Sequence, residues 1–182
     1  DWPFYQDLKS RPGVIHVELG QLHVDHTSWF LTGLQATYVC TFASGHKMEI
    51  SAPKHEFQRF PYRQYSQTAS RSSLCLHDEE YITNISFRSV DHITDRITIY
   101  TNLRKVSFGS PDISGFPQPF LLPIYTDGKD DCPIKSPSLF RRIVAMGGIT
   151  CERAEQIGCF SESVHWERVK HLVQLRKLVE LD

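Results

Sequence analysis

The chain has 182 residues, of which 40% are hydrophobic and 23% charged, proportions typical of one globular domain with its own core. Twenty Lys and Arg against 21 Asp and Glu leave a formal net charge of -1, so the surface lacks the overall positive charge of a nucleic-acid-binding protein. The sequence contains no apolar run long enough for a membrane-spanning helix, so we expect neither nucleic-acid binding nor membrane insertion.

Alternating or apolar segments separated by Gly, Pro, Ser and Asp predict β-strands through the first 160 residues. The clearest is 31–42, where period-two spacing places Leu34, Ala36, Tyr38 and Cys40 on one face. Many strands with almost no helical periodicity indicate an all-β fold, which the pattern alone leaves open as a sandwich, barrel or prism. The expected strands are 14–19, 31–42, 81–87, 96–101, 120–124, 142–146 and 157–160.

Two segments between these strands have the composition of loops. Residues 54–73 are polar and without clear period, and residues 125–138 are rich in Asp, Lys, Pro and Ser. Long loops in compact domains often carry function, so both segments are candidates for binding.

The last segment, 161–182, differs from the rest. Val169, Leu172 and Val173 begin an apolar stripe at helical spacing, with charged residues mostly off it. Ser163 suits the N-cap position of such a helix. We therefore expect a domain over residues 1–160 and a C-terminal amphipathic helix over 161–182, which either packs on the domain or pairs with a second chain.

The five cysteines form no CxxC pair, and their odd number excludes a fully paired intrachain set. We expect mostly buried thiols, with one disulfide still possible. Asn84 lies in a glycosylation sequon within a predicted strand, where a glycan would have to point away from the core. A first residue other than Met slightly favours secretion. The cysteines are Cys40, Cys75, Cys132, Cys151 and Cys159.

An ordered series of short motifs resembles the jacalin-related lectins. The series runs through Glu80-Tyr81-Ile82, Thr101-Asn102, Phe108-Gly109, Pro119–Pro123 and Ile143–Gly148, matching the family's EYI, TN, FG, PF-x-LP and IVGF-x-G steps in order. Residues 157–160 then resemble the family's AIG-x-Y step, and 13–19 and 34–38 resemble its first strands. The resemblance covers residues 13–160 and implies a β-prism of three four-stranded antiparallel sheets.

The resemblance also implies a sugar site. Family members bind one monosaccharide per domain through a G-x-x-x-D loop, whose Asp accepts hydrogen bonds from sugar hydroxyls while backbone N–H groups before it donate. The matching stretch here is Cys151-Glu152-Arg153-Ala154-Glu155. Cys151 replaces the Gly and Glu155 replaces the Asp, which lengthens the acceptor side chain by about 1.5 Å. The site is therefore either remodelled or lost.

Sugar preference follows from the residues beside the carboxylate. Galactose binders of the family tend to place an aromatic there, whereas this chain has Glu152 and Arg153, which favours mannose- or glucose-type glycans. The family's glycine-rich first loop has no counterpart in residues 1–12. Aromatic side chains elsewhere could stack on a sugar, and Lys54 and His55 lie in a segment that could approach it. These aromatics are Trp2, Tyr5, Tyr62 and Tyr65.

Other chemistry finds weaker support. His23, Asp25 and His26 form the best metal-like cluster, but alternation along a strand puts His26 on the opposite face from the other two, and no distant partner has ligand spacing. Residues 127–131 lack the order of a calcium loop. We therefore expect no cofactor and no metal.

Three functions remain in competition. The first is a non-catalytic lectin for mannose-type glycans, which would act as a homo-oligomer because linked weak sites gain avidity. The second is a β-prism that has lost its sugar site and binds protein through 125–138 or the C-terminal helix. The third, a glycan hydrolase, requires a second carboxylate across a cleft from Glu155, and the sequence suggests none.

Overall fold

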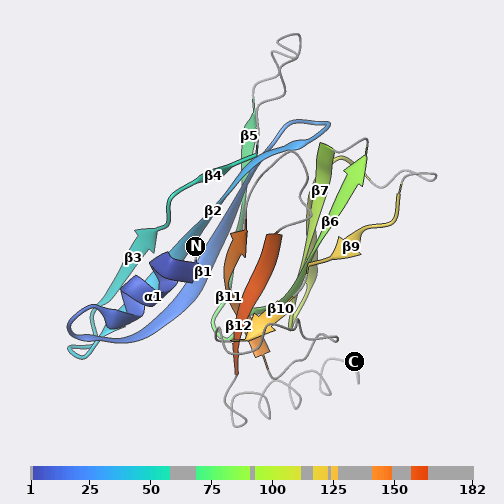
Figure 1. Cartoon of the computed structure of the whole chain (residues 1–182). Coiled ribbons are helices and arrows are strands. Elements are labelled where there is room, and N and C mark those ends of the chain that lie inside the picture. The colour runs from blue at the N-terminus through green and yellow to red at the C-terminus, as the bar shows by residue number, and fades with distance from the viewer. Residues whose placement is uncertain are drawn as a thin grey trace, which may run out of the picture.

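The computed structural model describes residues 2–57, 69–90, 93–111, 117–122, 124–126, 141–148 and 157–163. In this part of the chain three β-sheets surround one hydrophobic core (Figure 1). The predicted all-β architecture of three sheets is confirmed. The sheets contain five, four and three described strands rather than four each.

Sheet A is built on a long antiparallel hairpin and has the order β3-β2-β1-β5, with β4 beside β2. Its strands are β1 (Val14–His26), β2 (Leu31–Phe42), β3 (Lys47–Ser51), β4 (His55–Glu56) and β5 (Ser70–Cys75). β1 pairs with β2 over its whole length but with β5 only from Gln21 to His26. As predicted, Leu34, Ala36, Tyr38 and Cys40 all face the core.

β4 and β5 correct the prediction of a loop over residues 54–73. β5 has the sequence SRSSLC, in which only Leu74 is buried. Alternation puts Ser70 and Ser72 on the same face as Leu74, so this face carries one apolar side chain instead of the three that would mark a strand in the sequence. The pairing of β5 with β1 supplies the strand character that its composition does not.

Sheet B has the order β8-β7-β6-β9 and is antiparallel. Its strands are β6 (Ile82–Val90), β7 (Ile93–Thr101), β8 (Lys105–Gly109) and β9 (Phe120–Leu121). Ile85, Phe87, Ile97 and Ile99 from the two central strands are almost completely buried and form the core side of this sheet.

Sheet C contains β10 (Ile124–Thr126), β11 (Arg141–Gly148) and β12 (Ile157–Ser163), in the order β10-β12-β11. β11 and β12 are antiparallel, whereas β10 and β12 are parallel. The expectation of purely antiparallel sheets is therefore wrong at this pair. The single strand expected over 120–124 is also wrong, because β9 and β10 belong to different sheets.

A helix that the sequence analysis missed, α1 (Trp2–Ser10), precedes the first strand. Tyr5 and Leu8, one turn apart, are fully buried against the core, and Trp2 stacks on Phe160 of β12 with ring centroids 4.8 Å apart. α1 contacts both β1 and β11, so it joins sheets A and C. Trp2, Tyr5 and Leu8 are apolar residues at a spacing of three, but this pattern spans only two turns and is too short to predict a helix from the sequence.

Several predictions concern residues outside those described. They include most of the 125–138 segment, all but the first three residues of the 161–182 segment, and Cys132 and Cys151. Of the described cysteines, Cys40 and Cys159 are buried free thiols as expected, and Cys75 is exposed. The helix in the described part is not of the length and hydropathy that crossing a membrane requires.

Candidate functional site

The predicted sugar-binding residues Cys151, Glu152, Arg153 and Glu155 lie outside the described residues, but the two strands that flank them do not. β11 and β12 remain paired up to Gly148 and Ile157, immediately on either side of 149–156. β6 and β11 run in the same direction (Figure 1), so this connection leaves the sheets at the end where β6 turns into β7. We call this the upper end.

A buried ion pair holds the upper end together. Arg88 of β6 and Asp95 of β7 are 2% and 4% exposed, and the guanidinium Nη2 lies 2.6 Å from Oδ2 of the carboxylate. Arg88 also donates to the carbonyl of Pro111, and the amide of Ser110 donates to the carbonyl of Asp95. Because the Arg88 guanidinium is buried and bonded to protein groups, we assign it a structural role and not a ligand-binding one.

The turn between β1 and β2 lies at the same end. Gly109, with a φ of +98°, is the last residue of β8, and a Cβ there would collide with the carbonyl of Asp95 and press on Leu31 at the start of β2. In the turn, Trp29 is 62% exposed, while Thr27 fixes the backbone by accepting from the amides of Trp29 and Phe30. The sequence analysis did not single out Trp29, because no pattern distinguishes a turn aromatic from a core one.

The aromatic residues proposed to stack on sugar have other partners. Tyr5 is 0% exposed, and its hydroxyl donates to Glu162 of β12 at 2.9 Å. Burial, followed by the Glu162 charge, raises the pKa of this phenol well above its usual range. Trp2 lies against Tyr5 and Phe160. The expectation that Tyr5 could meet a sugar is therefore wrong, and Tyr62 and Tyr65 lie outside the described residues.

Lys54 and His55 lie on the edge of sheet A, where Lys54 belongs to a polar network. Lys54 Nζ is 2.8 Å from Asp25 Oδ2, and Arg71 binds both oxygens of the same carboxylate. The Arg71 bonds, opposed by burial and aided by Lys54, lower the pKa of Asp25 to about 2. Gly33 leaves room for this contact, since a Cβ would lie 2.9 Å from Lys54 Cε.

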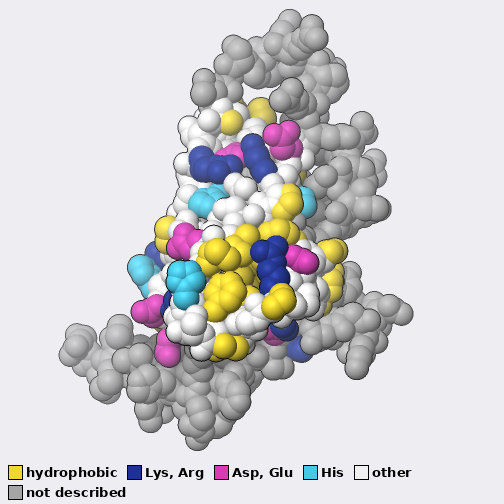
Figure 2. Space-filling view, turned by 90° about the vertical axis from the view of Figure 1, so that its left-hand side faces the viewer, with side chains coloured by type: hydrophobic (Ala, Val, Ile, Leu, Met, Phe, Trp, Pro, Cys, Tyr) yellow, Lys and Arg dark blue, Asp and Glu magenta, His cyan; other side chains and the backbone are white. Residues whose placement is uncertain are grey.

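Figure 2 shows the face that carries α1 and β3, with a hydrophobic patch over its lower half and charged and histidine side chains above and around the patch. His23 of β1 bonds to Ser73 of β5 and Thr37 of β2, so this histidine links three neighbouring strands. The described residues contain no group of three or more His, Cys, Asp or Glu able to hold a metal ion.

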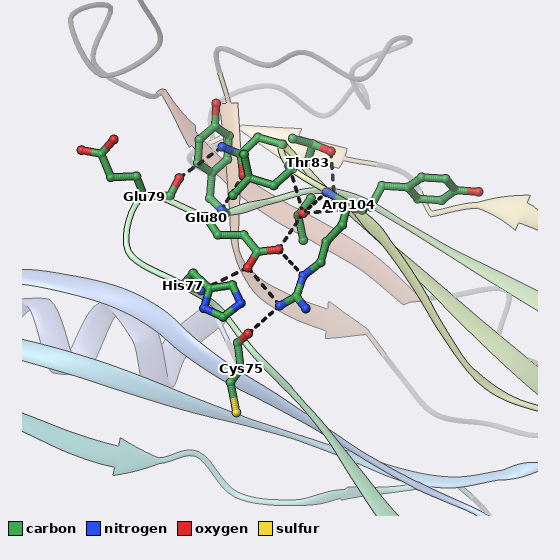
Figure 3. Close-up of polar contacts among 11 residues, drawn as sticks. Cys75, His77, Glu79, Glu80, Thr83 and Arg104 are labelled. Carbon is green, nitrogen blue, oxygen red and sulfur yellow. Dashed lines mark hydrogen bonds and ion pairs between the residues drawn. The ribbon is translucent and has the colours of Figure 1, made fainter. Parts of the chain in front are cut away.

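The opposite, lower end of sheet B centres on Glu80 (Figure 3). Its side chain is 0% exposed, and Arg104 donates to both carboxylate oxygens at 2.8 and 3.0 Å. Thr101 and the amide of His77 donate to the same carboxylate. Burial raises the pKa of Glu80, but these donors outweigh burial and hold it below the usual range. The Arg104 guanidinium also donates a hydrogen bond to the carbonyl of Cys75.

Asn102 completes this arrangement. Its side chain accepts from the amide of Tyr81 and donates to the carbonyl of Glu79. Glu79 has a φ of 65°, an uncommon conformation for a residue with a side chain, and the Asn102 bonds hold the backbone on both sides of Glu80. The Glu80-Tyr81-Ile82 and Thr101-Asn102 motifs are thus one interlocked unit.

Beside this unit lies a groove of about 830 Å³, which we call the acidic groove. It is bounded by the start of β1, the outer face of β2 and β3, residues 76–82 and the start of β11. Five carboxylates and two cationic side chains line it among the described residues: Glu18, Glu49, Asp78, Glu79 and Glu80 against Lys47 and Arg142. Sequence reasoning missed this groove, because its residues come from distant segments.

The glycosylation sequon has a different outcome. Asn84 is 4% exposed and Ser86 is 1% exposed, both within β6 between β7 and β9. Asn84 Oδ1 accepts from the amide of Ile85. A glycan on Asn84 is therefore incompatible with the folded chain.

Comparison with known proteins places the fold. The sequence matches no protein-family profile and no curated protein sequence. The structure is similar to Calystegia sepium agglutinin, with 16% identity, a TM-score of 0.51 and coverage of 85% of this chain and 92% of that one. It is also similar to the lectin MPA complexed with T-antigen disaccharide, with 19% identity, a TM-score of 0.50 and coverage of 84% and 96%. A prostate-specific WGA16 glycoprotein lectin has 14% identity, a TM-score of 0.51 and coverage of 81% and 84%.

Proposed function

We propose that this chain, which has the β-prism fold of the jacalin-related lectins, is a carbohydrate-binding lectin that performs no catalysis. The observation that carries the proposal is the likeness to three lectin structures over more than four fifths of the chain. Because a fold alone does not determine function, the site must be tested directly.

The proposed sugar site is the connection between β11 and β12 at the upper end. Glu155 would accept hydrogen bonds from two adjacent sugar hydroxyls, and the backbone near Glu152 and Arg153 would donate, with Cys151 in the position of the family's glycine. The rigid Arg88–Asp95 frame supports this location, since a sugar site needs a fixed support for its loops. Trp29, exposed at the same end, is available for contact with a sugar face.

The proposed specificity is for mannose- or glucose-type glycans. Glu152 and Arg153 put charge where a galactose-binding site of this family would have an aromatic ring, and charged side chains hydrogen-bond to hydroxyls rather than stack on a sugar face. We also propose a homo-oligomer as the working form, because single sugar contacts are weak and linkage multiplies them.

A glycan array with the purified chain tests the proposal, run beside Glu155→Ala and the control Glu49→Ala. Glu49 is an exposed carboxylate of the acidic groove at the lower end. We expect mannose-type glycans to bind, the Glu155 variant to lose binding and the Glu49 variant to retain it. Galactose-type binding would refute the specificity, and a wild-type chain that binds no glycan would refute the lectin.

The alternative is a β-prism that binds protein through residues 125–138 or 163–182. It is favoured by one departure from the family pattern, Cys151 in place of glycine. Deleting residues 164–182 separates the two functions. A lectin keeps its monosaccharide binding after the deletion, whereas a module that binds through residues 163–182 loses its partner.

A further inference from the structure

The lower half of β1 has an open edge among the described residues. β1 pairs with β5 from Gln21 to His26, and the amide of Leu76 donates to the carbonyl of Gly20 where that pairing stops. Residues 14–20 pair with β2 on one side, and no described strand pairs with them on the other. The pairing of β1 with β2 is irregular at Ile15 and Gly20, and the Val14 amide and Gly20 carbonyl already bond to Arg11 and Leu76. Because alternate residues of an antiparallel strand direct their N–H and C=O groups to either side, the unused strand-pairing groups lie in the regular stretch from residue 16 to residue 19.

The acidic groove runs along this edge. His16, Glu18, Leu19 and Gly20 of β1 line one side, and Arg142 to Val144 of β11 line another. α1 does not line the groove, since it packs on the core side through Tyr5 and Leu8. At about 3.3 Å per residue the regular part of the open edge, residues 16–19, pairs with roughly four residues of an extended peptide.

The groove is acidic and partly apolar. Arg142 lies 3.5 Å from Glu162 outside the groove and is balanced by it, and Glu80 is balanced by Arg104. Glu49 and Asp78 are exposed, and Glu18 is half-buried near His16. Apolar contact surface comes from Leu19, Val39 and Met48, and Met48 is 40% exposed. This lining complements a strand in which basic and apolar side chains alternate.

We propose that the acidic groove binds an extended basic peptide of a partner protein, which adds as a strand beside residues 16–19 of β1. Main-chain hydrogen bonds to the open edge would supply affinity, and the carboxylates would select Lys and Arg. The groove lies at the lower end and the predicted glycan loop at the upper end, so the two sites are independent. One chain would therefore bind a glycan and a basic peptide at once.

Three labelled peptides test the proposal by fluorescence anisotropy at physiological ionic strength, where weak long-range attraction is screened. The first alternates Lys and Val, the second replaces alternate Val by Pro, and the third replaces Lys by Glu. We expect only the first to bind well. Proline lacks the N–H that strand addition requires, so binding should weaken at least about tenfold in the second peptide.

Variants of the full chain locate the site. Glu49→Lys combined with Asp78→Lys should weaken the Lys/Val peptide at least about tenfold, whereas Glu56→Lys, an exposed charge reversal on β4 outside the groove, should change it less than about twofold. Ile15→Pro alters the backbone where the open edge begins, at an irregular position of β1 that is 67% exposed, and should weaken the same peptide. If this variant fails to fold, the proline peptide provides the same test.

Four results would overturn the proposal. The Lys/Val peptide could fail to bind, or the proline peptide could bind as tightly as the Lys/Val peptide. The Glu56→Lys control could weaken peptide binding as much as the Glu49→Lys and Asp78→Lys double variant does. Sedimentation could also show that the wild-type chain is a dimer and that Ile15→Pro dissociates it. The last would assign the open edge to a second copy of this chain. Glycan binding should be unchanged in every groove variant, so a failure of the peptide site is distinguishable from a failure of the lectin site.

Discussion

Sheet B is held at each end by an arginine–carboxylate pair, and the two pairs differ in their contact with water. At the upper end Arg88 and Asp95 have side chains 2% and 5% exposed. At the lower end the Glu80 side chain is 0% exposed, but that of Arg104 is 41% exposed. A guanidinium that reaches water can be solvated when its partner is lost, whereas an enclosed one cannot. The upper pair should therefore tolerate change least.

The largest expected effect is that of Asp95→Asn. The substitution keeps the shape but leaves the enclosed Arg88 charge without a counter-charge, so the free energy of unfolding should fall by about 3–5 kcal/mol in urea denaturation. The matched double variant Arg88→Met with Asp95→Leu removes both charges and should recover most of this loss. A single variant as stable as the parent would show that water reaches Arg88.

Glu80→Gln should have a smaller effect, about 1–3 kcal/mol by the same measurement. Glutamine retains the length and one acceptor oxygen, but it loses the charge that Arg104 binds. Its NH2 group replaces one of the two oxygens, so it must face either Thr101 or the amide of His77, both of which are donors. Thr83→Val in the same strand serves as a control, because Thr83 donates only to the carbonyl of Tyr100. If Glu80→Gln lowers the free energy of unfolding more than Asp95→Asn does, then exposure of the arginine does not determine which pair tolerates substitution better.

The smallest of the three expected effects is a loss of stability at low pH, caused by protonation of Asp25 in the Asp25–Arg71 pair of sheet A. The pKa of Asp25 is about 2 in the folded chain against 3.8 ordinarily, so the unfolded chain takes up this proton first as the pH falls. The stabilisation is complete above pH 3.8 and is lost as the pH falls toward 2, at a cost of about 1–2 kcal/mol after allowance for the exposed Arg71. Asp25→Asn should flatten this part of a stability–pH curve, and an unchanged slope would contradict it.

The motifs that predicted the fold are mostly structural in this chain. Thr101 and Asn102 bind the Glu79–Tyr81 segment directly, and Gly109 is required by the close approach of Asp95. They therefore identify how the strands pack and carry no information about a ligand. For this reason the order of the motifs predicted three sheets correctly. The predicted sugar site depends on a different segment, 151–155, in which Cys151 and Glu155 depart from the family pattern.

Other features could not be predicted because their cause is tertiary. β5 is a strand only because β1 lies beside it, and α1 is a short helix stabilised by burial of Tyr5 and Leu8. The acidic groove joins Glu18, Glu49 and Asp78, which are separated by tens of residues. A single sequence shows alternation within a segment, but it does not show which segments meet.

The buried sequon at Asn84 has a consequence for biosynthesis. Oligosaccharide transfer acts on an extended, accessible chain, so in a secretory compartment the enzyme would compete with the closing of β6 between β7 and β9. A chain that folds quickly would escape modification, whereas a chain that delays would carry a permanent obstacle to completing sheet B.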